Sequence, residues 1–408
     1  MKDVLELAMG LDALDSSHPI EIAVGHPSEV DEIFDAISYA KGGSVIRMLQ
    51  LWIGEENFRN GLQQYLTKYA YSNALTEDLW EELGKASGFP VQDVMSCWTS
   101  KMGFPLITAD IVSWENSKLT VKLSQSKFAN GNTDVTWKIP VSYMTQQNQT
   151  NTKFIMESQS TEIVVDLPQG NWLKFNSDGV GFYRVKYSKD LEEALLANLG
   201  SMDTRNKFNF LADLAAFTKW NLAPVTAYLD AVSALDNETN YIILDGVSDG
   251  LAKLTRFNKK LGIEEKYKEF RRKVFTPAYA KIGYGTQNEI TDGLLQALLI
   301  AVLGNSDHQE TVEYTKTQFS KMVDDLSSVK VCNCFVTDLL KTISGWYSTT
   351  NRKNRLKKPR LSWSVTKNLR YFNYCHGQVN SREVSVQIAG RAACRGIELL
   401  AKGRSQTC

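Results

Sequence analysis

The sequence predicts an α+β protein of several domains, in which a helical region, a β-sandwich and a second helical region follow one another. Two changes in hydrophobic periodicity carry this prediction. Apolar residues recur at helical spacing up to residue 103, alternate with polar residues over 104–188, and return to helical spacing from 189 onward. The length of 408 residues is enough for about two to four domains.

Residues 1–103 are expected to be mainly helical, after a short strand-like alternation at Ile20, Ile22 and Val24. The stretch "TEDLWEELGKASGFP" carries clear helix signals. Thr76 is the expected N-cap, because its hydroxyl can accept a hydrogen bond from the first turn. Gly88 is expected to end the same helix, because glycine readily adopts the left-handed conformation found after helix ends.

Residues 104–188 contain seven short segments of alternating polarity, separated by Asn, Gly, Asp and Gln. The segments are "LITADIV", "KLTVKLS", "VTWKIPVSYM", "TKFIMES", "TEIVVDL", "WLKFN" and "GFYRVKYS". Short strands with frequent turn signals are typical of a β-sandwich of modest size.

Residues 189–328 form successive amphipathic helical segments with short links, which indicates paired stacking as in a helical solenoid. Residues 329–408 differ in character: they are basic, poor in acid and without sustained periodicity. From 351 to the end there are 13 Lys and Arg against 2 Asp and Glu, a net charge of +11. We therefore expect 329–408 to be an atypical, disordered tail.

The bulk composition limits the classes of function. The whole chain carries no net charge, so nucleic-acid binding rests only on the basic tail, where Trp363 and Tyr371 lie near its charges. We rank that function last. The sequence has no run of about 18 apolar residues, so no spanning helix is expected. Six cysteines in 408 residues indicate reduced thiols and a cytoplasmic protein.

The sequence offers few residues for metal or nucleophilic chemistry. Its four histidines are His18, His26, His308 and His376, and none is followed by Glu, so a zinc helix of the HExxH type is absent from the 408 residues. His18 and His26 each precede a proline and are interpreted as structural. The remaining group, Cys332, Cys334, Cys375 and His376, matches no common zinc module. We therefore expect this chain to hold no metal by itself.

Tyr39 is the candidate catalytic residue. It lies about 200° around a helical wheel from Ile37, which belongs to the apolar face, so it should point toward solvent or a cleft. A phenol is a neutral hydrogen-bond donor at pH 7 and can stabilise an oxyanion. The alternative is an ordinary surface tyrosine. Close by, Gly42 and Gly43 cost a helix roughly 2 kcal/mol, which close packing, a bend or a site must offset.

A family resemblance gives Tyr39 a role. The stretch "LDALDSSHPIEIAVGHPSEVDEIFDAISYAKGGSVIRML" resembles the zinc aminopeptidases of the M1 (gluzincin) family, and looks most like their puromycin-sensitive, cytosolic branch. The resemblance continues through "TEDLWEELGKASGFPVQDVMSCWTSKMGFPLI", returns at "GNWLKFNSDGVGFYRVKYS" and fades by about residue 328. In that family the segment "ISYxKG" carries a tyrosine that stabilises the tetrahedral oxyanion, and Tyr39 stands in its position.

The resemblance also implies an architecture. Residues 1–103 would be the helical C-terminal part of a thermolysin-like catalytic domain, 104–188 the β-sandwich, and 189–328 an incomplete HEAT-like helical domain. The complete family enzyme uses zinc and releases N-terminal amino acids from peptides. The GAMEN-type recognition segment and the HExxH helix of the family have no counterpart in the 408 residues.

We therefore expect an M1-type aminopeptidase present as a truncated chain, inactive alone because zinc supplies both nucleophile and polarisation. An alternative is a non-catalytic pseudoenzyme that binds a peptide or a partner, for example a full-length aminopeptidase. Measuring the zinc content and the peptidase turnover of the purified chain would distinguish an active enzyme from both the inactive truncated chain and the binding pseudoenzyme.

Overall fold

A computed structural model of the chain describes residues 2–22, 25–26, 35–129, 131, 133–285 and 289–324. The chain divides into two compact units, Met1–Leu254 and Thr255–Cys408, and the division falls within helix α10 (Tyr241–Leu261). The tail predicted over 329–408 lies outside the described residues, as does the cluster of Cys332, Cys334, Cys375 and His376.

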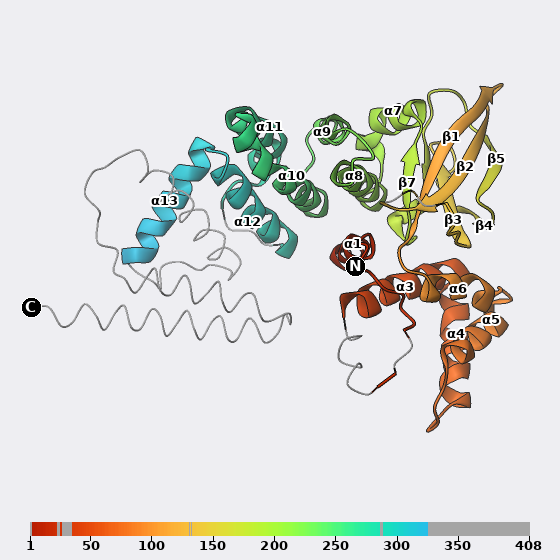
Figure 1. The fold of residues 1–408 in the computed structure, drawn as a ribbon. Coiled ribbons are helices and arrows are strands. Elements are labelled where there is room, and N and C mark those ends of the chain that lie inside the picture. The colour runs from red at the N-terminus through yellow and green to blue at the C-terminus, as the bar shows by residue number, and fades with distance from the viewer. Residues whose placement is uncertain are drawn as a thin grey trace, which may run out of the picture. The chain divides into compact units, whose positions relative to one another are not determined.

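The first part of unit 1 is helical, as its periodicity predicts (Figure 1). Its elements are α1 (Lys2–Asp12), the π-helical turn η2 (Ile37–Lys41), α3 (Gly42–Ile53), α4 (Glu55–Lys68), α5 (Thr76–Ser87) and α6 (Val91–Ser100). The buried residues of α3 include Val45, Met48 and Leu49, which share one helical face. That face packs into the core and so fixes the helix that follows η2.

Two details of this region differ from the prediction. Residues 18–22 form no strand, and the N–H of Glu21 instead donates to the carbonyl of Thr99. Thr76 is the first residue of α5 and not its N-cap, because Leu75 takes that place and its N–H donates to Asp78 at 2.8 Å. Gly88 ends the helix at φ 68°, as expected.

The seven strands predicted between 104 and 188 are present and form two sheets (Figure 1). They are β1 (Pro105–Glu115), β2 (Lys118–Lys127), β3 (Ile139–Thr145), β4 (Thr152–Met156), β5 (Ser160–Asp166), β6 (Leu173–Phe175) and β7 (Arg184–Tyr187). The four-stranded sheet has the order β5-β2-β1-β7, and the three-stranded sheet has the order β4-β3-β6. Only β7 pairs in parallel, with β1, among the described pairings.

Alternation explains why these segments are strands. In β2, Leu119, Val121 and Leu123 are fully buried while the residues between them face outward. The hydroxyl of Tyr187 on β7 accepts a hydrogen bond from the N–H of Phe175 on β6 at 2.9 Å, which connects the two sheets. The sheets therefore share one core and one polar joint.

Helices follow the sheets without interruption. Those within unit 1 are α7 (Lys189–Ala197), α8 (Thr204–Lys219), α9 (Val225–Ser233) and the start of α10. Asp203 caps α8 by accepting hydrogen bonds from the N–H groups of Arg205 and Asn206 at 2.9 and 3.2 Å. This cap fixes where α8 begins, and so fixes the position of the polar residues on its inner face.

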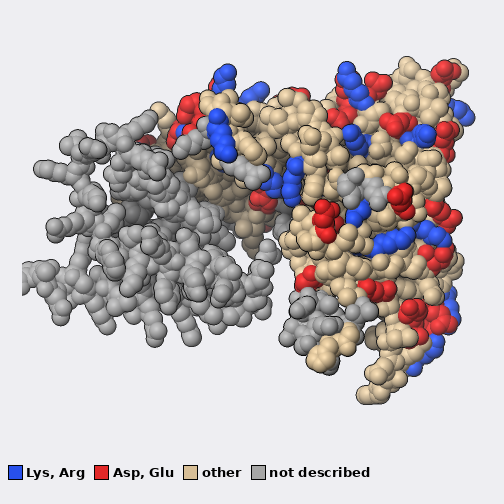
Figure 2. Space-filling model, in the orientation of Figure 1, with Lys and Arg blue, Asp and Glu red and all other residues tan. Residues whose placement is uncertain are grey.

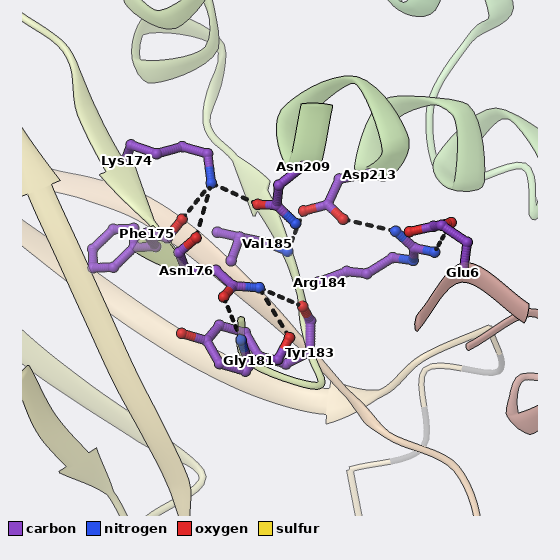
Figure 3. Close-up of polar contacts among 10 residues, drawn as sticks. All are labelled: Glu6, Lys174, Phe175, Asn176, Gly181, Tyr183, Arg184, Val185, Asn209 and Asp213. Carbon is purple, nitrogen blue, oxygen red and sulfur yellow. Dashed lines mark hydrogen bonds and ion pairs between the residues drawn. The ribbon is translucent and has the colours of Figure 1, made fainter. Parts of the chain in front are cut away.

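A buried ion-pair network joins α8 to the sheet and to α1 (Figure 3). The Arg184 guanidinium donates from Nη1 to Asp213 at 2.8 Å and from Nη2 to Glu6 at 2.9 Å. The second oxygen of Asp213 accepts from the N–H of Val185 at 3.2 Å. Arg184 and Asp213 are almost completely buried, so the paired charges satisfy each other where water cannot.

Beside it, Lys174 makes a second buried joint between β6 and α8 (Figure 3). Its ammonium donates to the carbonyls of Phe175 and Asn176 at 2.6 and 3.3 Å, and to Oδ1 of Asn209 at 2.6 Å. Desolvation lowers the pKa of Lys174 to about 8, against the attraction of Asp213 and other carboxylates. The three hydrogen bonds satisfy all three N–H groups of the ammonium, although the side chain is buried.

Unit 2 continues the helical series. It contains α11 (Glu264–Ile282), α12 (Ile290–Gly304) and α13 (Gln309–Asp324), and each packs on the next in chain order. Tyr284 stacks between Tyr279 and Tyr314, with ring centroids 4.6 and 4.5 Å apart. Aromatic stacking of this kind adds to the apolar contact that holds neighbouring helices together.

We predict that Asp213→Ala lowers the free energy of unfolding by about 3–5 kcal/mol, because it leaves the buried Arg184 charge without its closest partner. Asp166→Ala is the matched control. Asp166 is 89% exposed and 3.9 Å from Lys118, so its loss should cost less than about 1 kcal/mol. Urea unfolding followed by circular dichroism measures the free energy of unfolding of both variants. Equal losses of stability would contradict the larger contribution proposed for the buried pair.

Candidate functional site

Tyr39 lies in the middle of the turn η2, between buried residues. Its side chain is 65% exposed, whereas Ile37 is 4% and Ala40 5% exposed. The exposure expected from the helical wheel is therefore observed. In a π-helix the extra residue per turn widens the backbone, and such turns are frequent at functional sites. Here the widened turn leaves the phenol on the surface while its neighbours anchor the core.

Lys41, at the end of η2, is completely buried and forms the anchor of the turn. Its ammonium lies 3.0 Å from Oδ2 of Asp12, which is also completely buried. It donates to the carbonyls of Lys101 and Gly103 at 2.9 and 3.1 Å. Burial lowers the pKa of Lys41, and the Asp12 carboxylate opposes that shift. The turn is thereby tied to α1 and to the link that precedes β1.

Asp12 receives further bonds that fix this anchor. Its Oδ1 accepts from the hydroxyl of Ser17 at 2.6 Å and from the N–H of Gly103 at 2.9 Å. Gly103 has φ 84°, and a Cβ there would lie 2.6 Å from Cε of Lys127. Only glycine fits this position without strain, which keeps its N–H and carbonyl facing the ion pair.

At the start of the turn, His18 and Asp35 make a second attachment. Nε2 of His18 lies 2.7 Å from Oδ2 of Asp35, and Nδ1 lies 2.8 Å from the carbonyl of Pro19. Oδ1 of Asp35 accepts from the N–H of Ser38 at 2.9 Å, and its carbonyl accepts from the N–H of Tyr39 at 3.2 Å. The turn is therefore held at one end by the last residue of α1, Asp12, and at the other by His18 from the segment that follows α1.

Gly42 and Gly43 do not serve close packing. Both lie at the start of α3, Gly42 has ordinary helical angles of φ −53° and ψ −52°, and a Cβ at either would meet no heavy atom within 4 Å. Of the three explanations offered for these glycines, close packing is therefore wrong. What adjoins Gly42 is a mostly apolar groove of about 340 Å³, whose lining also includes Val45, Ile46, Tyr65 and Trp80.

On the face shown in Figure 2, acidic and basic side chains are interspersed over the described residues. Mixed charge of this kind produces no strong single-sign field.

Two family models match the chain. The one described as the peptidase family M1 domain matches residues 1–98, and the one described as the ERAP1-like C-terminal domain matches residues 172–343. The second match extends beyond residue 328, where the resemblance was expected to fade. The chain belongs to the M1 peptidase family.

Individual relatives agree. The puromycin-sensitive aminopeptidase of Caenorhabditis elegans is 31% identical over 337 residues, covering 80% of this chain and 35% of the relative. Aminopeptidase M1 of Arabidopsis thaliana is 34% identical over 337 residues, covering 77% and 38%. Aminopeptidase 2, mitochondrial, of Saccharomyces cerevisiae is 32% identical over 256 residues, covering 62% and 26%. The chain thus spans little more than a third of the length of the first two.

The described residues of this M1 family member do not fit a zinc ion. No group of three or more His, Cys, Asp or Glu side chains within the described ranges is arranged to hold a metal. Both ring nitrogens of His18 are already engaged, Nδ1 with the carbonyl of Pro19 and Nε2 with Asp35. We therefore derive no step through zinc from these residues.

The sequence singled out Tyr39 as a candidate but not the residues that hold its turn. It assigned no role to Asp12, Asp35 or Lys41, and His18 was interpreted as structural. The one available signal was a charged residue inside an apolar stripe, as at Lys41.

Among the helices of the described ranges, none combines the length and the apolar character that a membrane span requires.

We predict that Gly43→Ala raises the free energy of unfolding by about 0.5–1 kcal/mol, because the position is helical and a methyl group meets no atom. Gly88→Ala is the control. Its backbone has φ 68°, so the same change should destabilise the protein. Thermal unfolding of both variants gives the comparison, and a loss of stability in Gly43→Ala would restore a packing role for that glycine.

Proposed function

We propose that this chain carries the part of an M1 aminopeptidase that presents the oxyanion donor, and that Tyr39 is that donor. In the complete enzyme the reaction is release of N-terminal amino acids from peptides, with zinc supplied by residues outside this sequence. The observation that supports the role is the exposed tyrosine on a turn that is held at one end by a buried ion pair and at the other by a partly exposed carboxylate. A donor fixed before the reaction loses little energy to reorganisation.

Chemically, Tyr39 can act only as a hydrogen-bond donor. The tetrahedral intermediate of peptide hydrolysis places negative charge on the former carbonyl oxygen, and a neutral phenol can donate to it without adding a charge of its own. It cannot generate the nucleophile. We therefore propose that the 408-residue polypeptide alone neither binds stoichiometric zinc nor turns over peptides.

The domain assignment belongs to the same proposal. Residues 1–103 are the helical end of a thermolysin-like catalytic domain, 104–188 a β-sandwich and 189–328 a HEAT-like domain. The consecutive packing of α11, α12 and α13 supports the last of these. The cytoplasmic location inferred from cysteine content stays a prediction.

A second candidate is a non-catalytic binding protein. It is favoured by large apolar side chains exposed at the end of α4 and before α5, namely Leu66, Tyr71 and Leu75. Such side chains are more often found where another polypeptide covers them. A partner, including an intact aminopeptidase, would then be the ligand and not a substrate.

The role of Tyr39 is tested by grafting residues 1–98 into the matching segment of the Arabidopsis relative and replacing the tyrosine. Tyr39→Phe should lower kcat on an aminoacyl anilide by about 10²–10³-fold with little change in KM, because it removes a bond made mainly in the transition state. Zinc content should not change. Tyr71→Phe, at an exposed tyrosine outside the turn, is the control.

Wild-type kcat in the Tyr39→Phe graft would overturn the assignment. For the 408-residue chain alone, zinc analysis alongside the same assay decides its status. One zinc per chain with turnover would contradict the proposed dependence on residues outside this sequence. Co-purification of an intact aminopeptidase would favour the second candidate.

A further inference from the structure

The turn that carries Tyr39 is attached to one short segment of chain at both of its ends. Asp12 holds Lys41 after the tyrosine, and His18 holds Asp35 before it. The two attachments differ in kind. The Asp12–Lys41 pair is sealed from solvent, whereas His18 is 26% and Asp35 36% exposed. Only the second attachment contains a group that titrates near neutral pH in its ordinary state.

The geometry of His18 defines its protonation state in this arrangement. Nδ1 faces the carbonyl oxygen of Pro19 at 2.8 Å, and Nε2 faces a carboxylate oxygen of Asp35 at 2.7 Å. Both neighbours are acceptors only. A neutral imidazole has one N–H and can satisfy one of them, while the imidazolium has two and satisfies both. The observed contacts are therefore those of a protonated ring.

Asp35 transmits this state to the turn. One carboxylate oxygen accepts from His18, and the other accepts from the N–H of Ser38. Ser38 is the residue before the tyrosine, and the N–H of Tyr39 itself donates to the carbonyl of Asp35. When the imidazolium loses a proton, the N–H that remains stays on Nε2 toward the carboxylate. Nδ1 then no longer donates to the carbonyl of Pro19, and the bond to Asp35 loses its charge assistance, so the attachment of the turn weakens.

We propose that His18 is a positioning residue for Tyr39, and that loss of its proton loosens the turn that presents the phenol. The catalytic meaning of this switch rests on the proposed function, but the coupling between His18 and Tyr39 does not. Within the described residues, the carboxylates that act on His18 are Asp35 and Asp12, and the latter is already bound to Lys41.

The direction of the pH effect follows from the pKa shifts of both His18 and Asp35. Burial lowers the pKa of His18, but the bonds to Pro19 and Asp35 and the charges of Asp35 and Asp12 raise it above 6.5 overall. Burial raises the pKa of Asp35, but the bonds to Ser38 and His18 lower it below 3.8 overall. The attachment is thus complete at mildly acidic pH. It weakens as pH rises through the raised pKa of His18, and it is lost as pH falls through the lowered pKa of Asp35.

The test places 3-fluorotyrosine at position 39 alone in the 408-residue protein and follows its ¹⁹F resonance from about pH 5 to about pH 7.5, below the ordinary titration range of a phenol. We expect an inflection at the pKa of His18, which is measured separately from its own ring protons. His18→Gln and Asp35→Asn should each abolish the inflection. His308→Gln, which removes an imidazole from unit 2, should leave it unchanged.

A fluorotyrosine at Tyr71 serves as the probe control and should show no inflection at that pH. A flat response at position 39 in the wild-type protein overturns the proposal, as does an inflection that survives in folded His18→Gln. Circular dichroism confirms that each variant is folded before its spectrum is interpreted.

Enzyme kinetics in the grafted relative separate this inference from the proposed function. His18→Gln should lower kcat by about tenfold with KM nearly unchanged, and should remove one alkaline-side ionisation from the pH profile. If the fluorine inflection is present but Tyr39→Phe leaves kcat unchanged, the function of Tyr39 fails and the coupling stands. If Tyr39→Phe is slow but the inflection is missing, the coupling fails and the function stands.

Discussion

The buried pair of Asp12 and Lys41 is the interaction on which the region around Tyr39 depends. Both side chains are completely inaccessible and lie 3.0 Å apart. Taking two charges out of water costs several kcal/mol each unless hydrogen bonds replace the lost hydration. Here the carbonyls of Lys101 and Gly103, the Gly103 N–H and the Ser17 hydroxyl supply those bonds. One point thus joins α1, the turn η2 and the link into β1.

Helix α1 takes part in two such joints. Asp12 at its end binds the turn, and Glu6 within it binds Arg184, which also binds Asp213 on α8. Because Arg184 lies on β7, the same short helix connects the helical region, the sheet and the helices that follow. Removing Asp12 would leave the buried Lys41 charge without its carboxylate, and removing Asp213 would leave the buried Arg184 with only the partly exposed Glu6.

This construction suits a donor that must be in place before the reaction begins. A phenol that stabilises an oxyanion is effective only at hydrogen-bond distance and in a fixed direction. The turn keeps Ile37, Ala40 and Lys41 inside and leaves Tyr39 65% exposed, so the core fixes the backbone while the tyrosine faces outward. The proposed function gives this exposed tyrosine the role of such a donor, and no metal-holding group accompanies it within the described residues.

Much of the fold could be predicted from local pattern. Short segments of alternating polarity between turn residues indicated the seven strands, most clearly in β2, where alternate residues are buried. Gly88 ended its helix as expected, since few other residues adopt φ 68° without strain. The exposure of Tyr39 followed from its angle to Ile37. The strand expected at Ile20 and Ile22 failed, because alternation over so few residues does not guarantee a pairing partner.

What the sequence determined by itself is therefore the set of strands and most helices, and a tyrosine facing outward. What only the tertiary structure decided is how that tyrosine is held. Asp12 pairs with Lys41 and His18 with Asp35, and the members of each pair lie far apart in the sequence. Polar residues show no periodic pattern from which such partners could be predicted. The spacing of apolar residues predicts which face of a helix or strand is buried. Which charged residues pair depends on how the helices and strands pack in three dimensions, and the spacing does not show this.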